Sequence, residues 1–149
     1  MLTWTEVAER LAPWRNYWIS TVDLAGGPHV SPVWGAVVDD VLYFYTEDGT
    51  VKARNLERDP RVAVHLESGD DVVIVRGTAE PVGRPGAHPE VVAAFAAKYA
   101  RPDDVQYVPT ASDQVNQLFA VRPTNALVWL LEDYDGSQRR WTAAPKDPR

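Results

Sequence analysis

A lysine and two threonines lie close together around a tight turn near the middle of the chain. Thr46 ends an aromatic run, the turn residues 47–49 follow it, and Thr50 and Lys52 come next. If a helix begins here, its free N–H groups, the hydroxyls and the ammonium could together bind a phosphate. The same residues also fit a capped connector helix whose charges are simply solvated.

Short elements must hold these residues in place. Leu42 to Thr46 is aromatic and strand-forming, and Glu47-Asp48-Gly49 has turn chemistry. Thr50 is an N-cap for a predicted helix through Arg58. That helix must stop before Pro60, because proline disfavours helical geometry at the residue preceding it.

A set of motifs around this turn resembles the pyridoxamine 5'-phosphate oxidase-like superfamily, the flavin-reductase-like split β-barrels that bind FMN or the deazaflavin coenzyme F-420. The resemblance covers residues 16–82 well and the remainder loosely. Its motifs, in chain order, are Pro28-His29-Val30-Ser31-Pro32-Val33-Trp34, Phe44-Tyr45-Thr46, Thr50-Val51-Lys52, Asn55-Leu56, Asp59-Pro60-Arg61-Val62 and the strand from Val73 to Glu80.

The resemblance implies where a cofactor would bind. The family's phosphate lies against the turn after the aromatic strand, and the flat ring lies along the preceding strand. Backbone groups of Val30 to Trp34 would then read the ring edge, while Trp34 packs on the ring or belongs to the core. The implied cofactor-binding residues are Val30, Pro32, Trp34, Thr46, Thr50, Val51, Lys52 and Asn55.

One departure from the family bears on the choice of cofactor. The oxidase branch usually has Ser-Arg-Lys where this chain has Thr50-Val51-Lys52, so Val51 removes a phosphate-binding arginine. This change favours coenzyme F-420 over FMN. Arg54, Arg58 and Arg61 could meet the longer anionic tail of that coenzyme, or they could form a solvated helix face.

The resemblance implies an oxidoreductase that transfers a hydride between coenzyme F-420 and a small conjugated substrate. Two alternatives remain: an FMN-dependent relative of pyridoxamine 5'-phosphate oxidase, and a non-catalytic binder of a flavin, haem or another tetrapyrrole. No side chain is marked as catalytic; Tyr45, Tyr99 and Tyr107 are the candidate acids. Residues 101–117 and a second subunit are expected to line the substrate pocket.

Composition excludes several other classes. The net charge of −6 argues against nucleic acid as the main partner, and the absence of cysteine removes disulfides and thiolate metal sites. His29, His65 and His88 lack metal-ligand spacing, so no metal is expected. No apolar run approaches a membrane span, and the N-terminus does not resemble a signal peptide. We therefore expect a cytoplasmic protein with no membrane partner.

Alternation and turn chemistry predict a mainly β fold. Six to eight antiparallel strands close into a barrel with two or three peripheral helices, and the resemblance names this an FMN-binding split barrel. Residues 1–142 form one domain and residues 143–149 a disordered tail. The predicted helices are 3–14, 50–58 and 90–100, and the strands are 17–23, 28–38, 41–46, 62–66, 72–82, 117–121, 125–131 and 138–142.

The resemblance further implies a homodimer with the cofactor near its interface. Six tryptophans and six tyrosines suit such a large apolar contact. Near the C-terminus, Arg139-Arg140-Trp141 resembles the Thr-Arg-Trp pattern of many deazaflavin-dependent members. These arginines are either a positive pair at the partner-subunit edge or a solvated pair.

Overall fold

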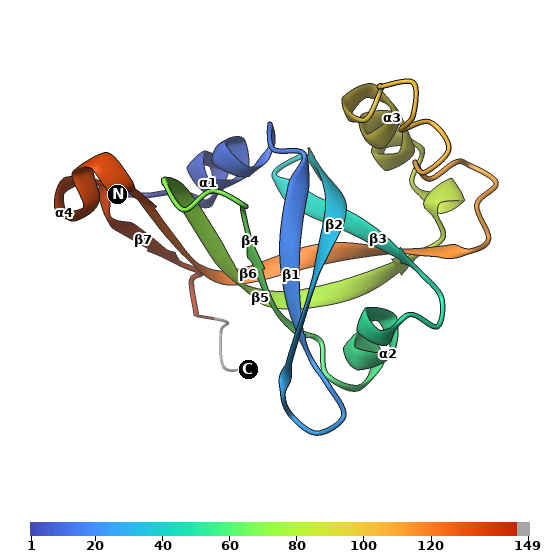
Figure 1. Ribbon diagram of the computed structural model, residues 1–149, viewed down its shortest axis with the longest axis horizontal. Helices are drawn as coiled ribbons and strands as arrows, with labels where there is room; N and C mark the ends of the chain where they lie inside the picture. The colour runs from blue at the N-terminus through green and yellow to red at the C-terminus, as the bar shows by residue number, and fades with distance from the viewer. Residues whose placement is uncertain (146–149) are drawn as a thin grey trace.

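A closed antiparallel barrel forms the body of the protein in a computed structural model that describes residues 1–145. The sheet order is β3-β2-β1-β4-β5-β6-β7, and an additional β3–β6 pairing closes six strands while β7 lies outside (Figure 1). The predicted mainly β barrel is therefore confirmed. The strands are β1 Asn16–Val22, β2 Pro28–Val38, β3 Val41–Glu47, β4 Arg61–His65, β5 Asp71–Gly83, β6 Asn116–Leu130 and β7 Arg139–Thr142.

Four short helices of the described residues 1–145 lie around the barrel. Thr3 caps α1 in a capping box with Glu6, and Thr50 caps α2 through a bond from the Ala53 N–H. The Thr50 cap follows the sequence expectation, and in both helices a hydroxyl satisfies a free N–H of the first turn. The helices are α1 Trp4–Leu11, α2 Val51–Arg58, α3 Pro89–Lys98 and α4 Tyr134–Ser137, with 3-10 turns at Pro85–Ala87 and Leu131–Asp133.

Buried apolar side chains form two clusters in the part of the chain that the structure describes. Alternate residues of β1, β3 and β4 point inward, as period-2 burial along each strand shows, and form the barrel core with α1. A smaller cluster joins α3 to the outside of β2 and includes Phe95 and Tyr99. The second cluster matters for function because it fixes the residues that follow α3.

The prediction of two strands at 117–121 and 125–131 is wrong, because β6 runs unbroken through Arg122-Pro123. A bulge absorbs the interruption: Arg76 of β5 pairs with Asn125, but Gly77 pairs with Pro123, leaving Thr124 as an extra residue. A side chain at Gly77 would place its Cβ 2.1 Å from the Arg122 carbonyl oxygen. Proline is tolerated here because the ladder is already irregular.

Strand β2 changes partner halfway along its length. Residues 28–34 pair with β1, whereas residues 35–38 pair with β3. Strand β3 pairs with β6 from Tyr43 to Glu47, but with β2 only as far as Phe44, beyond which it diverges from β2. Pro32 lies in the half of β2 without a β3 neighbour, which agrees with the edge position expected of a strand proline. This split opens one side of the barrel.

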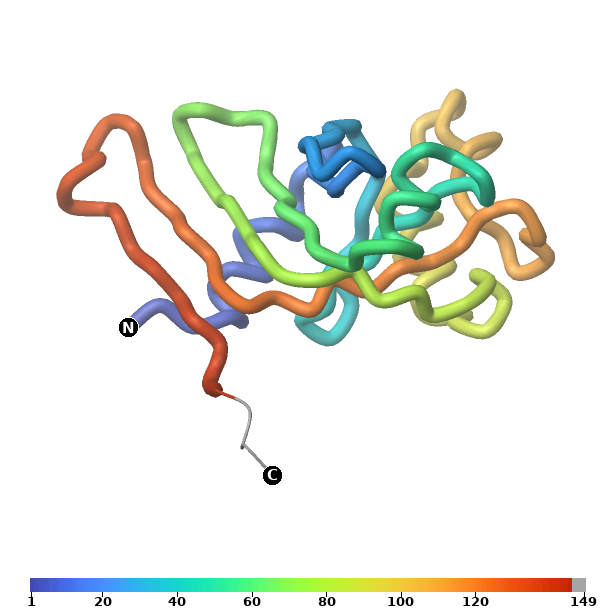
Figure 2. Tube along the Cα trace, turned by 90° about the horizontal axis from the view of Figure 1, so that it is seen from below, coloured from blue at the N-terminus to red at the C-terminus, as the bar shows by residue number. Residues whose placement is uncertain are grey.

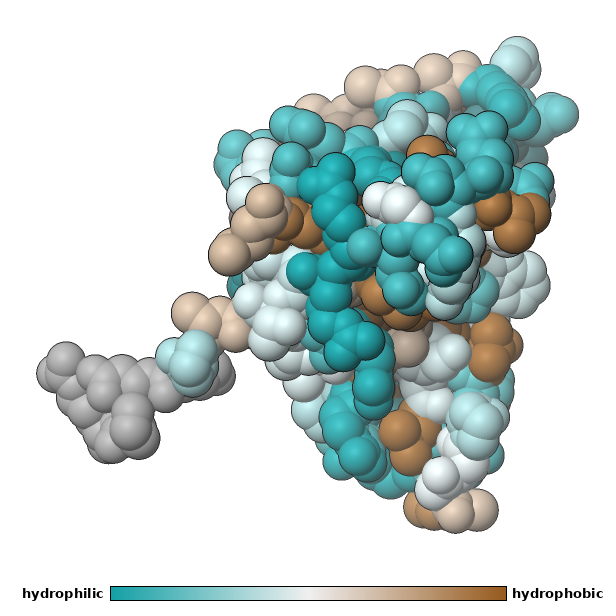
Figure 3. Space-filling view, turned by 90° about the vertical axis from the view of Figure 1, so that its left-hand side faces the viewer, coloured by the Kyte–Doolittle hydropathy of each residue, from teal (hydrophilic) through white to brown (hydrophobic). Residues whose placement is uncertain are grey.

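The two ends of the molecule differ. Helix α3 and the irregular residues 99–115 lie at one end, and α4 with β7 lies at the other (Figure 2). The α4 end is mostly hydrophilic, with separate hydrophobic spots (Figure 3). No helix within residues 1–145 is long and apolar enough to cross a membrane. The predicted disordered tail begins inside this range, but its residues 146–149 lie outside the described part.

Candidate functional site

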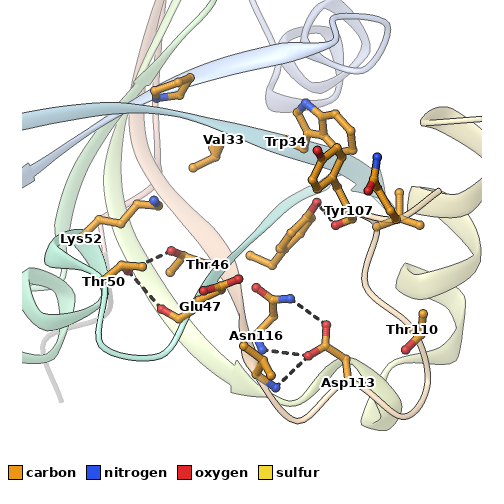
Figure 4. Close-up of a pocket in the computed structure, with 15 residues that line it drawn as sticks. Val33, Trp34, Thr46, Glu47, Thr50, Lys52, Tyr107, Thr110, Asp113 and Asn116 are labelled. Atoms are coloured by element: carbon orange, nitrogen blue, oxygen red, sulfur yellow. Dashed lines mark hydrogen bonds between the residues drawn. The ribbon is translucent and has the colours of Figure 1, made fainter. Parts of the chain in front are cut away.

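A cleft of about 620 Å³ lies where β2 and β3 diverge, and the irregular residues 106–115 with the start of β6 close its far side (Figure 4). Polar groups from the β3–α2 turn form one wall and aromatic groups the opposite wall. The lining residues are Pro32, Val33, Trp34, Tyr45, Thr46, Glu47, Thr50, Lys52, Gln106, Tyr107, Val108, Thr110, Asp113, Val115 and Asn116.

Two threonine hydroxyls belong to the polar wall. Thr46 is 4% exposed, and its Oγ1 lies 3.0 Å from the Oγ1 of Thr50. The Thr50 hydroxyl also accepts from the Ala53 N–H and lies 3.1 Å from the Glu47 carbonyl oxygen. Since α2 begins here, the N–H groups of Val51 and Lys52 have no intrahelical acceptor.

Lys52 extends from the first turn of α2 into the cleft (Figure 4). Burial lowers the pKa of its half-buried ammonium, and the nearby Glu47 charge partly opposes this shift. Within the described residues, Lys52 forms no ion pair. A desolvated cation without a carboxylate partner is a favourable place for an anionic ligand.

The opposite wall is aromatic. Trp34 stacks on Tyr99 with ring centroids 4.3 Å apart and an angle of 6° between the planes. Tyr107 meets Trp34 edge-on, with centroids 6.2 Å apart. Such a wall suits a flat ligand, because aromatic rings bury a large area and stack on other π-systems.

Carboxylates line the mouth of the cleft. Asp113 accepts bonds from the backbone N–H groups of Val115 and Asn116 and from the Asn116 amide. Burial raises the pKa of Asp113, but these hydrogen bonds outweigh it and hold that pKa below its usual range. Glu47 is exposed on the Lys52 side. Lys52 therefore favours an anionic group beside it, although Glu47 partly opposes this, and Asp113 disfavours one on its own side.

Five of the eight residues implied by the resemblance line one cleft: Pro32, Trp34, Thr46, Thr50 and Lys52. Val30 and Val51 are 50% and 44% exposed and lie outside it. Asn55 is buried at 2% exposure against β1. Its amide donates to the Thr21 hydroxyl and its carbonyl oxygen accepts from Arg58, so both ends of the side chain are engaged away from the cleft.

Several lining residues had no signal of their own in the sequence. Thr110 and Asp113 come from the irregular stretch and Asn116 begins β6; residues 101–117 were expected to line a substrate pocket, but they contain no motif. Position in the fold, and not residue spacing, brings these groups to the cleft.

The three candidate tyrosines differ in availability. Tyr45 donates to the Tyr107 carbonyl oxygen at 2.8 Å, and burial raises its pKa. The Tyr99 hydroxyl lies behind the wall within 2.9 Å of the carbonyl oxygens of Arg15 and Gly35, and burial raises its pKa to about 12. Tyr107 is exposed and lines the cleft. Only Tyr107 is thus placed to present its hydroxyl to a ligand.

The three histidines lie elsewhere. His65 and His88 contact the carbonyl oxygens of Leu66 and Val82, and His29 Nδ1 is buried without a hydrogen-bond partner. None of them lines the cleft. Residues 1–145 contain no group of three or more His, Cys, Asp or Glu side chains arranged for a metal ion.

The closed barrel, its split and the cleft inside that split define a split β-barrel protein. Residues 4–129 match the pyridoxamine 5'-phosphate oxidase family, and the chain belongs to it. No curated protein matches the sequence.

Solved structures share this fold. A conserved hypothetical protein from Mycobacterium tuberculosis is 24% identical with a TM-score of 0.72, covering 98% of this chain and 94% of its own. An F-420 reductase is 26% identical with a TM-score of 0.63, covering 79% and 94%. A haem-binding protein from Mycobacterium smegmatis is 18% identical with a TM-score of 0.73; 95% of this chain aligns with 59% of that chain.

Proposed function

We propose that the protein is an oxidoreductase that binds coenzyme F-420 in the cleft and transfers a hydride between it and a small conjugated substrate. The observation that carries this proposal is the half-buried Lys52 ammonium, which lies beside two threonine hydroxyls and opposite an aromatic wall. A ligand with a phosphate at one end and a flat ring at the other matches both walls.

The residues present fit such a group. Lys52, Thr46 and Thr50 would hold the phosphate, with the free N–H groups at the start of α2. The half of β2 without a β3 neighbour would offer backbone groups to the ring edge, and Trp34 with Tyr107 would pack on the ring and exclude water. The bound deazaflavin or flavin supplies the hydride chemistry.

Coenzyme F-420 is our first choice and FMN the alternative. The F-420 reductase among the structural relatives supports the first, as does the valine at position 51. The family to which the chain belongs supports the second. The protein would act as a homodimer with the cofactor near the interface, so that a second copy helps to form the substrate pocket.

The aromatic wall also supports a non-catalytic candidate, because Trp34 and Tyr107 could stack on any flat macrocycle. The haem-binding protein among the structural relatives supports haem as this macrocycle. Against it, none of the three histidines lines the cleft, so the commonest axial ligand of haem iron is missing there.

Substitution of Lys52 tests the proposal. Removing a charge-assisted contact to a phosphate costs about 1.5–3 kcal/mol, so Lys52→Ala should weaken coenzyme F-420 binding about 10- to 100-fold. Arg122→Gln is the control, because it removes one positive charge at an exposed pair with Glu80 outside the cleft. Titration monitored by cofactor fluorescence measures both. Unchanged affinity in Lys52→Ala would show that the phosphate assignment is wrong.

A further inference from the structure

A bidentate ion pair lies directly behind the aromatic wall. Asp104, only 4% exposed, accepts from both terminal nitrogens of Arg15 at 2.9 and 2.6 Å. It also accepts from the Arg101 N–H at 3.3 Å. The hydrogen bonds from Arg15 lower the pKa of Asp104. This pair connects the segment before β1 to the irregular residues after α3, two segments that are distant in sequence.

Arg15 also contacts the wall itself. Its guanidinium carbon lies 4.8 Å from the centroid of the Trp34 ring and 5.5 Å from that of Tyr99. The Tyr99 hydroxyl lies 2.7 Å from the Arg15 carbonyl oxygen. Arg15 therefore holds the Trp34–Tyr99 stack through both its backbone and its side chain, and cation–π attraction favours this placement.

Asp104 holds the other half of the wall. The Tyr107 N–H donates to the Asp104 carbonyl oxygen at 2.9 Å, so the turn that buries the carboxylate also sets the Tyr107 backbone. Tyr45 holds the Tyr107 backbone at a second atom by donating its hydroxyl to the Tyr107 carbonyl oxygen. As a result, the edge-on contact between Tyr107 and Trp34 depends on where Asp104 is held.

We infer that Arg15 and Asp104 are positioning residues that hold the aromatic wall at the spacing a flat ring system needs. Neither side chain lines the cleft, so both act through Trp34 and Tyr107. A lysine could not replace Arg15, because a single ammonium cannot bond both carboxylate oxygens and cover a ring in one fixed plane. The ligand part of this inference rests on the proposed function; the geometric part does not.

A pair of ligands separates this role from phosphate binding. Riboflavin and FMN share one ring system, but only FMN carries a phosphate. Loosening the wall should weaken both ligands by the same factor, whereas Lys52→Ala should weaken FMN alone. A general loss of structure would lower thermal stability as well, so each variant is compared at a temperature well below its unfolding midpoint.

The test uses Asp104→Asn and Arg15→Lys, with Asp103→Asn and Arg122→Lys as controls. Asp103 is the exposed neighbour of Asp104, and Arg122 belongs to an exposed pair outside the cleft. We expect about tenfold weaker binding of both flavins and faster chymotrypsin cleavage after Tyr107 in the first two variants, with no change in the controls. Arg15→Lys keeps the charge and is informative if Asp104→Asn does not fold.

Flavin affinity and the rate of chymotrypsin cleavage together test the positioning role. If Arg15→Lys binds both flavins as the wild type does and resists chymotrypsin equally, the positioning role is wrong. If the wild type binds no flavin and no coenzyme F-420, the proposed function fails. The chymotrypsin rate and the near-ultraviolet circular dichroism of the stacked rings in the cofactor-free protein then decide the inference: wild-type values overturn it, and changed values support it.

Discussion

Burial lowers the pKa of two lysines, Lys52 and Lys98, which differ in their surroundings. Lys52 faces the cleft, whereas Lys98 at the end of α3 donates to the Gly35 carbonyl oxygen and the Tyr17 hydroxyl at 2.7 and 2.8 Å. The Lys98 ammonium lies 4.7 Å from the Tyr17 ring centroid and 5.3 Å from that of Tyr99. These partners are neutral, so burial dominates and lowers the pKa of Lys98 to about 8.

A rise in stability with pH follows from Lys98. Between about pH 8 and the unfolded value of 10.5, the folded state has lost this proton while the unfolded state keeps it, so stability increases through that window. Burial raises the pKa of Tyr17 and Tyr99 above 10, so they do not oppose the rise below pH 10. Urea unfolding at about pH 7 and about pH 9.5, on either side of the folded-state pKa of Lys98, should show a higher free energy of unfolding at the higher pH in the wild type.

Lys98→Met is the comparison that identifies the source of this gain. In this variant, most of the difference in unfolding free energy between the two pH values should disappear. Lys52→Met should remove less of it, because the pKa of Lys52 is also lowered but the nearby Glu47 charge opposes that shift. An equal gain in wild type and Lys98→Met would contradict the assignment.

At the scale of single elements, both ends of α2 were predictable from the sequence. The turn residues, the hydroxyl at the N-cap and the Asp59-Pro60 stop are all local signals, and the helix occupies Val51–Arg58 as a result. The role of Asn55 was not predictable in the same way. Its burial against Thr21 depends on packing between α2 and β1, which no local pattern reveals.

Replacing the cap of α2 should affect both stability and binding. Thr50→Ala removes the acceptor for the Ala53 N–H and should cost about 1 kcal/mol in the free energy of unfolding. It also removes a cleft hydroxyl, so cofactor affinity should fall. Thr50→Ser keeps the hydroxyl and should retain both properties within a few tenths of a kcal/mol. Denaturant unfolding and cofactor titration of the pair measure this; equal behaviour of the two variants would refute the cap.

The bulge between β5 and β6 makes another element-scale prediction. Gly77→Ala would place a methyl group 2.1 Å from a backbone oxygen, which cannot move without breaking the ladder. We expect a loss of about 3 kcal/mol in unfolding free energy. Gly69→Ala is the matched control: no atom lies within 4 Å of its added Cβ, so it should change stability by less than about 0.5 kcal/mol.

Strand prediction failed where local and non-local signals disagreed. Arg122-Pro123 indicates a break on its own, but the partner strand supplies Gly77 and accommodates it, so β6 continues. By contrast, β2 was predicted with the right bounds, because a turn ends before Pro28 and Asp39-Asp40 turns the chain after Val38. The contacts of residues 99–115 depend on Arg15 and Tyr45, and were not predictable from periodicity.

At the scale of the whole molecule, the proposed homodimer can be tested directly. Light scattering after size exclusion should give about twice the chain mass of 16.6 kDa. We propose that Val30, an apolar side chain 50% exposed on β2, lies in this subunit contact, so Val30→Glu should shift the equilibrium toward monomer. Leu131→Glu, in the exposed 3-10 turn before α4, is the control. A monomeric wild type at all concentrations would contradict the dimer.

The split itself is the feature that joins fold to function. Because only residues 35–38 of β2 pair with β3, a cation, two hydroxyls and an aromatic wall face one cavity that a regular barrel would have closed. The most direct test of the account is therefore a side-by-side titration of the purified cofactor-free protein with coenzyme F-420 and FMN, followed by tryptophan quenching. The account predicts saturable binding in which coenzyme F-420 is the tighter ligand. Tighter binding of FMN would reverse the cofactor choice, and binding of neither would contradict the central claim.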